Sequence, residues 1–323
     1  MEINEKNIKL WSALGSRAVF GLAMFEEAKK RNDLMMLTCD VSTSAGLDRY
    51  RKKYPEKYID LGISEQNLIG VASGLSHEGY EVFTTTFSPF QTLRCCEQIK
   101  VNMGYMKNKI VMVGLASGLC LGTLGFTHCS IEDIGSIRSI PNIDIISPAD
   151  CLETIKAVEA SFAHNNSLYI RLTGSSNNGI VNNEDYDYKI GKSIEIENFG
   201  KDFVIISCGS ILKNCLDVVR NLNKKNINGS LINMHTIKPI DKNKIVELSK
   251  KYKNIFTFEE HNIYGGLGSA VAEVLSNIST DCILHINGVR DEYIKGGSYK
   301  YLLEKYNLSV EKIEKKIKNQ LNI

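Results

Sequence analysis

The sequence predicts an α/β protein made of two doubly wound domains. Short apolar runs alternate with segments of helical periodicity along all 323 residues. Strands separated by helical segments of roughly 10–15 residues pair in parallel, and parallel sheets need helices on both faces. A stretch rich in Asn, Gly and acidic residues, 174–191, interrupts this alternation. We interpret it as a linker between a first domain, residues 1–180, and a second domain, residues 190–323.

Apolar periodicity predicts the elements of the first domain in order. Cap-like pairs support two helix starts, because Asp150 is followed by Glu153 and Ser130 by Asp133. Pro89 lies where the first turn of a helix tolerates proline. The expected helices are 12–30, a helix starting at Ser64, and 151–163, and the expected strands are 34–37, 58–61, 82–87, 109–115 and 168–172.

The second domain repeats the alternation of strands and helices. The expected strands are 203–209, 229–234, 254–260 and 282–286. The expected helices are 210–225, 241–252 and 266–277, followed by two closing helices, the last of which contains the Lys-rich segment 309–318.

Composition excludes several classes of protein. The net charge is +2, from 39 basic and 37 acidic residues, so bulk charge predicts no nucleic acid partner. Nine cysteines without a CxxC pair favour reduced thiols in the cytoplasm, and they predict no metal site in this chain. The first ten residues lack the apolar core of a signal peptide. The uncharged run 110–126 is short and rich in Gly, so we expect a strand and a turn and no membrane span.

Chemically useful side chains follow the predicted strands. They lie in the segments 40–44, 62–65, 87–90 and 122–128 and at position 171. Ligands of doubly wound sheets bind at the carboxyl ends of the strands, so these groups predict a site for an anionic ligand with an aromatic portion. A structural interpretation is also open, in which Glu65 stabilises a helix dipole and the phenylalanines belong to the core.

The chain resembles the transketolase family over nearly its whole length. The segments YIDLGISEQNLIGVASGLS, TTTFSPF, GTLGFTHCSIEDIGSIRSIPNIDIISPAD and YIRLTG resemble the pyrimidine-binding domain of transketolases. The segments KPID and FEEHNIYGGLGSAVAEVL resemble the C-terminal domain of the same family. The order and spacing of these segments are similar to those of the second half of a transketolase, encoded as a separate subunit when the enzyme is split in two.

This resemblance implies thiamine diphosphate as the coenzyme and assigns roles to four residues. Glu65 matches the glutamate that faces N1′ of the aminopyrimidine ring, where it has to hold or share a proton, and we expect apolar walls around it to favour this. Phe87 and Phe90 match the residues that pack on the pyrimidine ring. His128 matches the histidine that faces the C1 hydroxyl and carbonyl oxygen of the donor.

Four more residues match positions that bind the sugar. Arg17, Ser44 and Arg171 match the positions that hold the sugar phosphate, for which guanidinium groups are well suited. Asp40 matches a carboxylate that lines the same pocket. Leu124 and Ala116 stand where common transketolases carry polar residues that contact sugar hydroxyls. We therefore expect a substrate other than the usual pentose phosphates.

The resemblance also implies a partner. Transketolases bind the diphosphate and its Mg²⁺ through a GDG motif, which this sequence lacks. We therefore expect a separate diphosphate-binding subunit that holds the Mg²⁺, an α₂β₂ assembly, and no activity from this chain alone. Three alternatives stay open: a subunit like 1-deoxyxylulose-5-phosphate synthase, a subunit like the E1β chain of 2-oxoacid dehydrogenases, and a non-catalytic assembly subunit.

Overall fold

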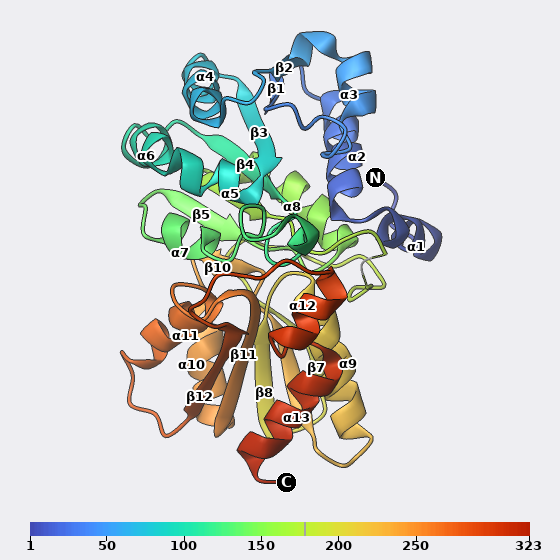
Figure 1. The fold of residues 1–323 in the computed structure, drawn as a ribbon, viewed down its shortest axis with the longest axis vertical. Helices are drawn as coiled ribbons and strands as arrows, with labels where there is room; N and C mark the ends of the chain where they lie inside the picture. The colour runs from blue at the N-terminus through green and yellow to red at the C-terminus, as the bar shows by residue number, and fades with distance from the viewer. Residues whose placement is uncertain (178) are drawn as a thin grey trace.

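The computed structural model describes residues 1–177 and 179–323, which form two β-sheets with helices around them (Figure 1). The first sheet has seven strands in the order β10-β5-β6-β4-β3-β1-β2, and all its neighbours pair in parallel except β10 and β5. Its strands are β1 (Leu34–Thr38), β2 (Tyr58–Asp60), β3 (Glu81–Phe87), β4 (Ile110–Leu115), β5 (Ile143–Ile146), β6 (Ser167–Arg171) and β10 (Thr236–Lys238).

The second sheet has five strands in the order β12-β11-β8-β9-β7, and its edge strand β7 runs antiparallel to β9. Its strands are β7 (Ile194–Asn198), β8 (Phe203–Ser207), β9 (Gly229–Asn233), β11 (Asn254–Asn262) and β12 (Ile283–Val289). Strands β5, β7 and β10 were not expected from the sequence, because they are short and, apart from β5, lie at sheet edges where apolar patterning is weak.

Helices cover both faces of each sheet, which confirms the doubly wound prediction. The longer helices are α1 (Glu5–Leu14), α2 (Ser16–Ala28), α4 (Glu65–His77), α8 (Cys151–Ala163), α9 (Ile211–Asn223), α10 (Lys242–Lys251), α11 (Leu267–Leu275) and α13 (Val310–Leu321). The shorter ones are α3 (Asp48–Lys53), α5 (Ser88–Gln91), α6 (Cys96–Ile99), α7 (Asp133–Arg138), α12 (Tyr299–Lys305), η1 (Pro55–Lys57), η2 (Leu93–Cys95), η3 (Lys100–Tyr105) and η4 (Gly122–Leu124).

Alternate residues of β1 show how the first sheet is sandwiched. Met36 packs in a cluster with Phe20 of α2 and Leu152 of α8. Leu37 points to the opposite face and belongs to a cluster that includes Leu68 of α4. Successive side chains of a strand point to opposite faces, so apolar residues on both faces require helices on both.

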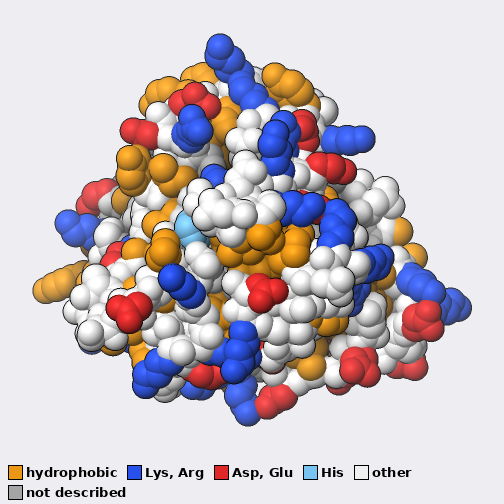
Figure 2. Space-filling model, turned by 90° about the horizontal axis from the view of Figure 1, so that it is seen from below, with side chains coloured by type: hydrophobic (Ala, Val, Ile, Leu, Met, Phe, Trp, Pro, Cys, Tyr) orange, Lys and Arg blue, Asp and Glu red, His pale blue; other side chains and the backbone are white. Residues whose placement is uncertain are grey.

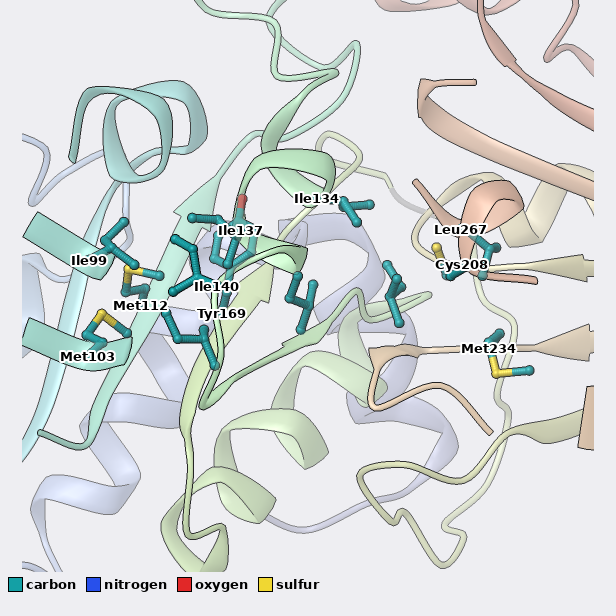
Figure 3. Close-up of a cluster of buried hydrophobic side chains, with 14 of the residues drawn as sticks. Ile99, Met103, Met112, Ile134, Ile137, Ile140, Tyr169, Cys208, Met234 and Leu267 are labelled. Atoms are coloured by element: carbon teal, nitrogen blue, oxygen red, sulfur yellow. The ribbon is translucent and has the colours of Figure 1, made fainter. Parts of the chain in front are cut away.

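One apolar cluster continues from the first sheet into the second. It includes Met112 of β4, Ile137 of α7, Met234 after β9 and Leu267 of α11 (Figure 3). Strand β10 also crosses over, because it follows the second sheet's β9 in sequence but pairs with β5. The boundaries at 180 and 190 stay a prediction.

Several local expectations have a clear outcome. The helix expected over 12–30 is two helices, because Gly15 adopts a φ of +87° and ends α1 before α2 begins. Asp150 caps α8 by accepting a hydrogen bond from the backbone N–H of Glu153, as predicted. The cap by Ser130 is wrong, since α7 starts after Glu132 without a side-chain cap. No helix of the described residues is long and apolar enough to cross a membrane.

Charge is mixed on the molecular surface. On the face shown in Figure 2, Lys and Arg side chains are interspersed with Asp and Glu side chains around a central apolar area. This distribution agrees with the nearly balanced charge of the sequence.

A buried polar network lies where the two sheets meet. Arg171 at the end of β6 is 2% exposed, and its Nε donates to Asp133 Oδ2 over 2.7 Å. Its Nη2 donates to the carbonyl oxygens of Ser130 (3.0 Å) and of Glu260 in β11 (2.8 Å). Burial by itself would raise the pKa of Asp133, but the charges of Arg171 and His261 and hydrogen bonds from Arg171 and Tyr169 outweigh it and lower the pKa.

His261 of β11 lies beside this network in its neutral form. Its Nε2 accepts a hydrogen bond from the backbone N–H of Gly135, and its Nδ1 donates to the carbonyl oxygen of Asn262. Burial lowers the pKa of His261 to about 4, against the opposing effect of Asp133.

A first prediction concerns the contact between α2 and the turn after β1. A Cβ added at Gly21 would lie 2.1 Å from the carbonyl oxygen of Gly46, whereas a Cβ at Gly70 in α4 would meet nothing within 4 Å. We expect Gly21→Ala to lower the free energy of unfolding by about 1–3 kcal/mol through overpacking. The control Gly70→Ala raises it by about 0.5–1 kcal/mol. Urea unfolding of both variants checks this, and equal effects would contradict the close approach of α2.

A second prediction concerns pH. The folded pKa of His261 is about 4, below the value of about 6.5 expected when unfolded, so unfolding at an intermediate pH takes up a proton. The stability that neutral His261 contributes is therefore complete above about pH 6.5 and is lost as the pH falls toward 4. We expect His261→Gln to destabilise the chain by about 2 kcal/mol less at about pH 5 than at about pH 8. The exposed His77 provides the control His77→Gln, and the same pH effect there would refute the assignment.

Candidate active site

The candidate site lies at the carboxyl ends of the parallel strands β2, β3 and β4. Glu65 is the first residue of α4, five residues after the end of β2, and is buried at 4% exposure. Phe87 ends β3, and Phe90 lies in α5 immediately afterwards. His128 belongs to the loop after β4. Since these strands run parallel, their following segments meet at one sheet edge, as the sequence predicts.

Three rings form what we call the aromatic cluster: Phe87, Phe90 and His128. The His128 ring centroid lies 5.2 Å from that of Phe90 and 5.9 Å from that of Phe87, and both contacts are edge-to-face. The two phenylalanine rings also meet edge-to-face, at 6.4 Å. All three side chains are half-buried, so the cluster offers apolar faces and an imidazole to a bound molecule.

Arg94 connects Glu65 to the aromatic cluster, and sequence reasoning missed it. Its Nη1 donates to Glu65 Oε2 over 2.8 Å, and its guanidinium carbon lies 4.0 Å from the Phe90 ring centroid. A cation within an otherwise apolar segment after TTTFSPF was the available signal. The surroundings of Glu65 therefore differ from the apolar walls we expected, because the carboxyl group has a cationic partner.

Asp60 is a second residue that the sequence did not single out. Its Oδ1 accepts hydrogen bonds from the backbone N–H groups of Asp40 (2.9 Å) and Gly62 (3.0 Å), so it joins the loops after β1 and β2. Burial would raise the pKa of Asp60, but these two backbone hydrogen bonds help to lower it below its usual value. Asp40 itself is exposed and adopts a φ of +55°.

Arg17 and Ser44 line one polar cavity of about 410 Å³. Arg17 comes from the first turn of α2 and Ser44 from the loop after β1. Ser175 and Ser176 line the opposite part of the cavity. Helix α2 has no side-chain cap at its N-terminus, so its free N–H groups add to the positive potential of Arg17. The cavity has the chemistry of an anion site.

Arg171 does not belong to this cavity, which corrects the sequence interpretation. Its guanidinium is buried and donates to Asp133 and to the carbonyl oxygens of Ser130 and Glu260. A substrate phosphate could reach it only by breaking a buried ion pair, which costs about 3–5 kcal/mol. We remove Arg171 from the set of phosphate ligands. The roles of the other predicted residues stay predictions.

The described residues contain no group of three or more His, Cys, Asp or Glu side chains arranged to hold a metal ion. The donors that are present suit an aminopyrimidine ring, because a buried carboxylate at a helix start stands beside flat apolar rings. They offer no comparable set of ligands for a diphosphate with its cation.

Comparison with known proteins agrees with this arrangement. Residues 12–178 match the family model of the transketolase pyrimidine binding domain, and residues 192–313 match that of the transketolase C-terminal domain. One of the two subunits of the apulose-4-phosphate transketolase of Phocaeicola vulgatus is 30% identical over 93% of this chain and 95% of its own length. A putative transketolase C-terminal section of Methanocaldococcus jannaschii is 33% identical over 95% of this chain and 96% of its own.

A solved structure of a split gene transketolase, described as an inactive beta4 tetramer, is similar with a TM-score of 0.86 and 31% sequence identity. The similarity covers 96% of this chain and 99% of that one. Two family models in the order of the two sheets, and relatives matched over almost their full length, establish the relationship. The chain belongs to the transketolase family.

Proposed function

We propose that this chain is the C-terminal subunit of a two-subunit, thiamine diphosphate-dependent transketolase, which moves a two-carbon ketol unit from a ketose to an aldose. The observation that carries the proposal is the buried Glu65 at the start of α4, beside the aromatic cluster. Thiamine diphosphate, when bound, supplies carbanion chemistry at its C2 carbon. The protein then has to orient the ring, manage protons and bind the sugar.

Glu65 has two carboxyl oxygens for two partners in this proposal. Arg94 donates to Oε2, and we assign Oε1 to the ring nitrogen N1′. Phe87 and Phe90 pack on the pyrimidine ring and exclude water from it. Arg94 fixes the carboxyl group in one orientation, since it is held both by Glu65 and by the face of Phe90.

His128 is placed to act on the donor sugar. Its Nδ1 is 3.0 Å from Thr127 Oγ1, which orients the imidazole ring. We propose that Nε2 faces the C1 hydroxyl and carbonyl oxygen of the donor and exchanges a proton there. The edge-to-face contacts with the two phenylalanine rings hold the imidazole next to the pyrimidine position.

The cavity at Arg17 and Ser44 is the proposed phosphate site. A guanidinium, a hydroxyl and the uncapped start of α2 provide several donors for a dianion. Asp40 follows β1 in the same loop as Ser44, and we propose that it contacts a sugar hydroxyl.

We propose that a partner subunit binds the diphosphate and its Mg²⁺, and that the two subunits form an α₂β₂ assembly in the cytoplasm. The absence of a GDG motif supports this division of labour. Two relatives support it as well, since one is named as a single subunit of its transketolase and the other is a beta tetramer described as inactive.

We propose a substrate that differs from the usual pentose phosphates. Leu124 is 55% exposed on η4, where an apolar side chain cannot bind a sugar hydroxyl, and Ala116 is buried and small. The relative named for apulose 4-phosphate supports this, because its name places a sugar outside the usual pair with a similar subunit. A synthase that uses pyruvate is the alternative reaction, and an assay that offers pyruvate in place of a ketose separates the two.

A third prediction tests Glu65 in the complex of this chain, its diphosphate-binding partner, thiamine diphosphate and Mg²⁺. We expect Glu65→Ala to lower kcat about 10²–10⁴-fold, because the ring nitrogen loses its proton partner. The control Glu56→Gln, at an exposed carboxyl group, keeps full activity. Unchanged turnover of Glu65→Ala would favour the non-catalytic assembly role, and full activity of this chain alone would contradict the two-subunit proposal.

A fourth prediction tests the phosphate site. We expect Arg17→Ala to raise KM for a phosphorylated sugar about 10–100-fold, with a smaller change in kcat, because a charge-assisted contact remote from the reacting atoms is lost. The exposed Arg49, which stacks on Phe25, provides the control Arg49→Ala. Equal KM values for Arg17→Ala and the wild type would place the phosphate elsewhere.

A further inference from the structure

A serine hydroxyl ties together the two segments that carry the aromatic cluster. Ser88 lies directly after Phe87, and its Oγ is 3.0 Å from Ser130 Oγ and 3.1 Å from Asp133 Oδ2. Ser130 follows His128 by two residues. The backbone positions of Phe87 and His128 are therefore linked through buried side chains, independently of the contacts between their rings.

Tyr169 of β6 closes this link from the neighbouring part of the sheet. Its hydroxyl group forms hydrogen bonds with Ser88 Oγ and with Asp133 Oδ2, the latter over 2.7 Å. The adjacent strand β4 leaves space for it at Gly114, where an added Cβ would lie 2.5 Å from the Tyr169 hydroxyl oxygen. Asp133 Oδ2 thus accepts from Ser88, Tyr169 and Arg171, and a carboxylate oxygen shared in this way defines the position of all three.

Arg171 continues the chain of contacts into the second sheet. It holds Asp133 through Nε and the carbonyl oxygen of Glu260 in β11 through Nη2. Burial would lower the pKa of Arg171, but Asp133 outweighs this and raises it, so the guanidinium stays charged. Since both ions are buried, neither can move without leaving the other unpaired.

We propose that Arg171, Asp133 and Tyr169 are positioning residues of the active site, which transmit the placement of β11 to Ser88 and so to the aromatic cluster. The second sheet then contributes to the site without touching it. The catalytic consequence rests on the proposed function, but the positioning itself is a property of this chain.

Tyr169→Phe is the variant of choice, because it removes one hydroxyl and keeps the ring. Tyr299→Phe is its matched control, since the Tyr299 hydroxyl also donates to a buried glutamate, Glu260 Oε1, over 2.7 Å, but lies outside the Ser88 contacts. Ser88→Ala tests the same link from the other end. Arg171→Lys keeps a positive charge but loses the fork that holds two partners at once.

The first measurement uses this chain alone, with ¹³C-labelled phenylalanine and histidine rings followed by NMR. We expect Tyr169→Phe and Ser88→Ala to shift or broaden the ring signals of Phe87, Phe90 and His128, and Tyr299→Phe to leave them unchanged. Unchanged ring signals in Tyr169→Phe and Ser88→Ala, with lowered thermal stability, would overturn the proposal, because the network would then be purely structural.

The second measurement uses the complex with its partner. We expect Tyr169→Phe to raise KM for thiamine diphosphate about 10-fold and to lower kcat, as misplacement of the ring-binding side chains predicts, while Tyr299→Phe changes neither. Shifted ring signals in a complex that acts on no ketose would support positioning and contradict the proposed function. Unchanged ring signals and KM in an active complex would do the reverse.

Discussion

The buried ion pair between Arg171 and Asp133 is the interaction on which the rest of the structure depends. It lies where β6, the start of α7 and β11 come together, and it satisfies backbone carbonyl oxygens of both sheets. Removing one member of such a pair typically costs about 3–5 kcal/mol, because the other charge is left buried and alone. The pair gives the meeting point of the sheets a defined geometry that the surrounding Ile and Met side chains, which pack without direction, would not impose.

The candidate site lies on the first sheet but inherits its geometry from several elements. Glu65 is placed by the start of α4, and the phenylalanines by the end of β3 and by α5. Arg94 comes from η2 and bridges the carboxyl group and the aromatic cluster. The phosphate cavity is built separately, at the start of α2, so recognition of the ring and of the sugar's charged end use different parts of one sheet edge.

Sequence reasoning succeeded where a residue's environment follows from its neighbours in the chain. Alternating apolar runs predicted both sheets, and Asp150 predicted the start of α8 because a cap acts within four residues. It failed where the environment depends on distant segments. Ser130 and Asp133 have the spacing of a cap, but their side chains face Ser88 and Arg171. The exposure of an arginine cannot be deduced from the segment that contains it.

The sequence by itself determined the fold class, the family resemblance and the residues available at the strand ends, because hydrophobic periodicity and strand direction are local properties. Tertiary structure alone decided which of these residues meet. It placed Arg94 on Glu65, gathered Arg17 and Ser44 into one cavity, and directed Arg171 into the protein. The physical reason is that burial and electrostatic pairing depend on contacts between segments far apart in the chain, which no local pattern encodes.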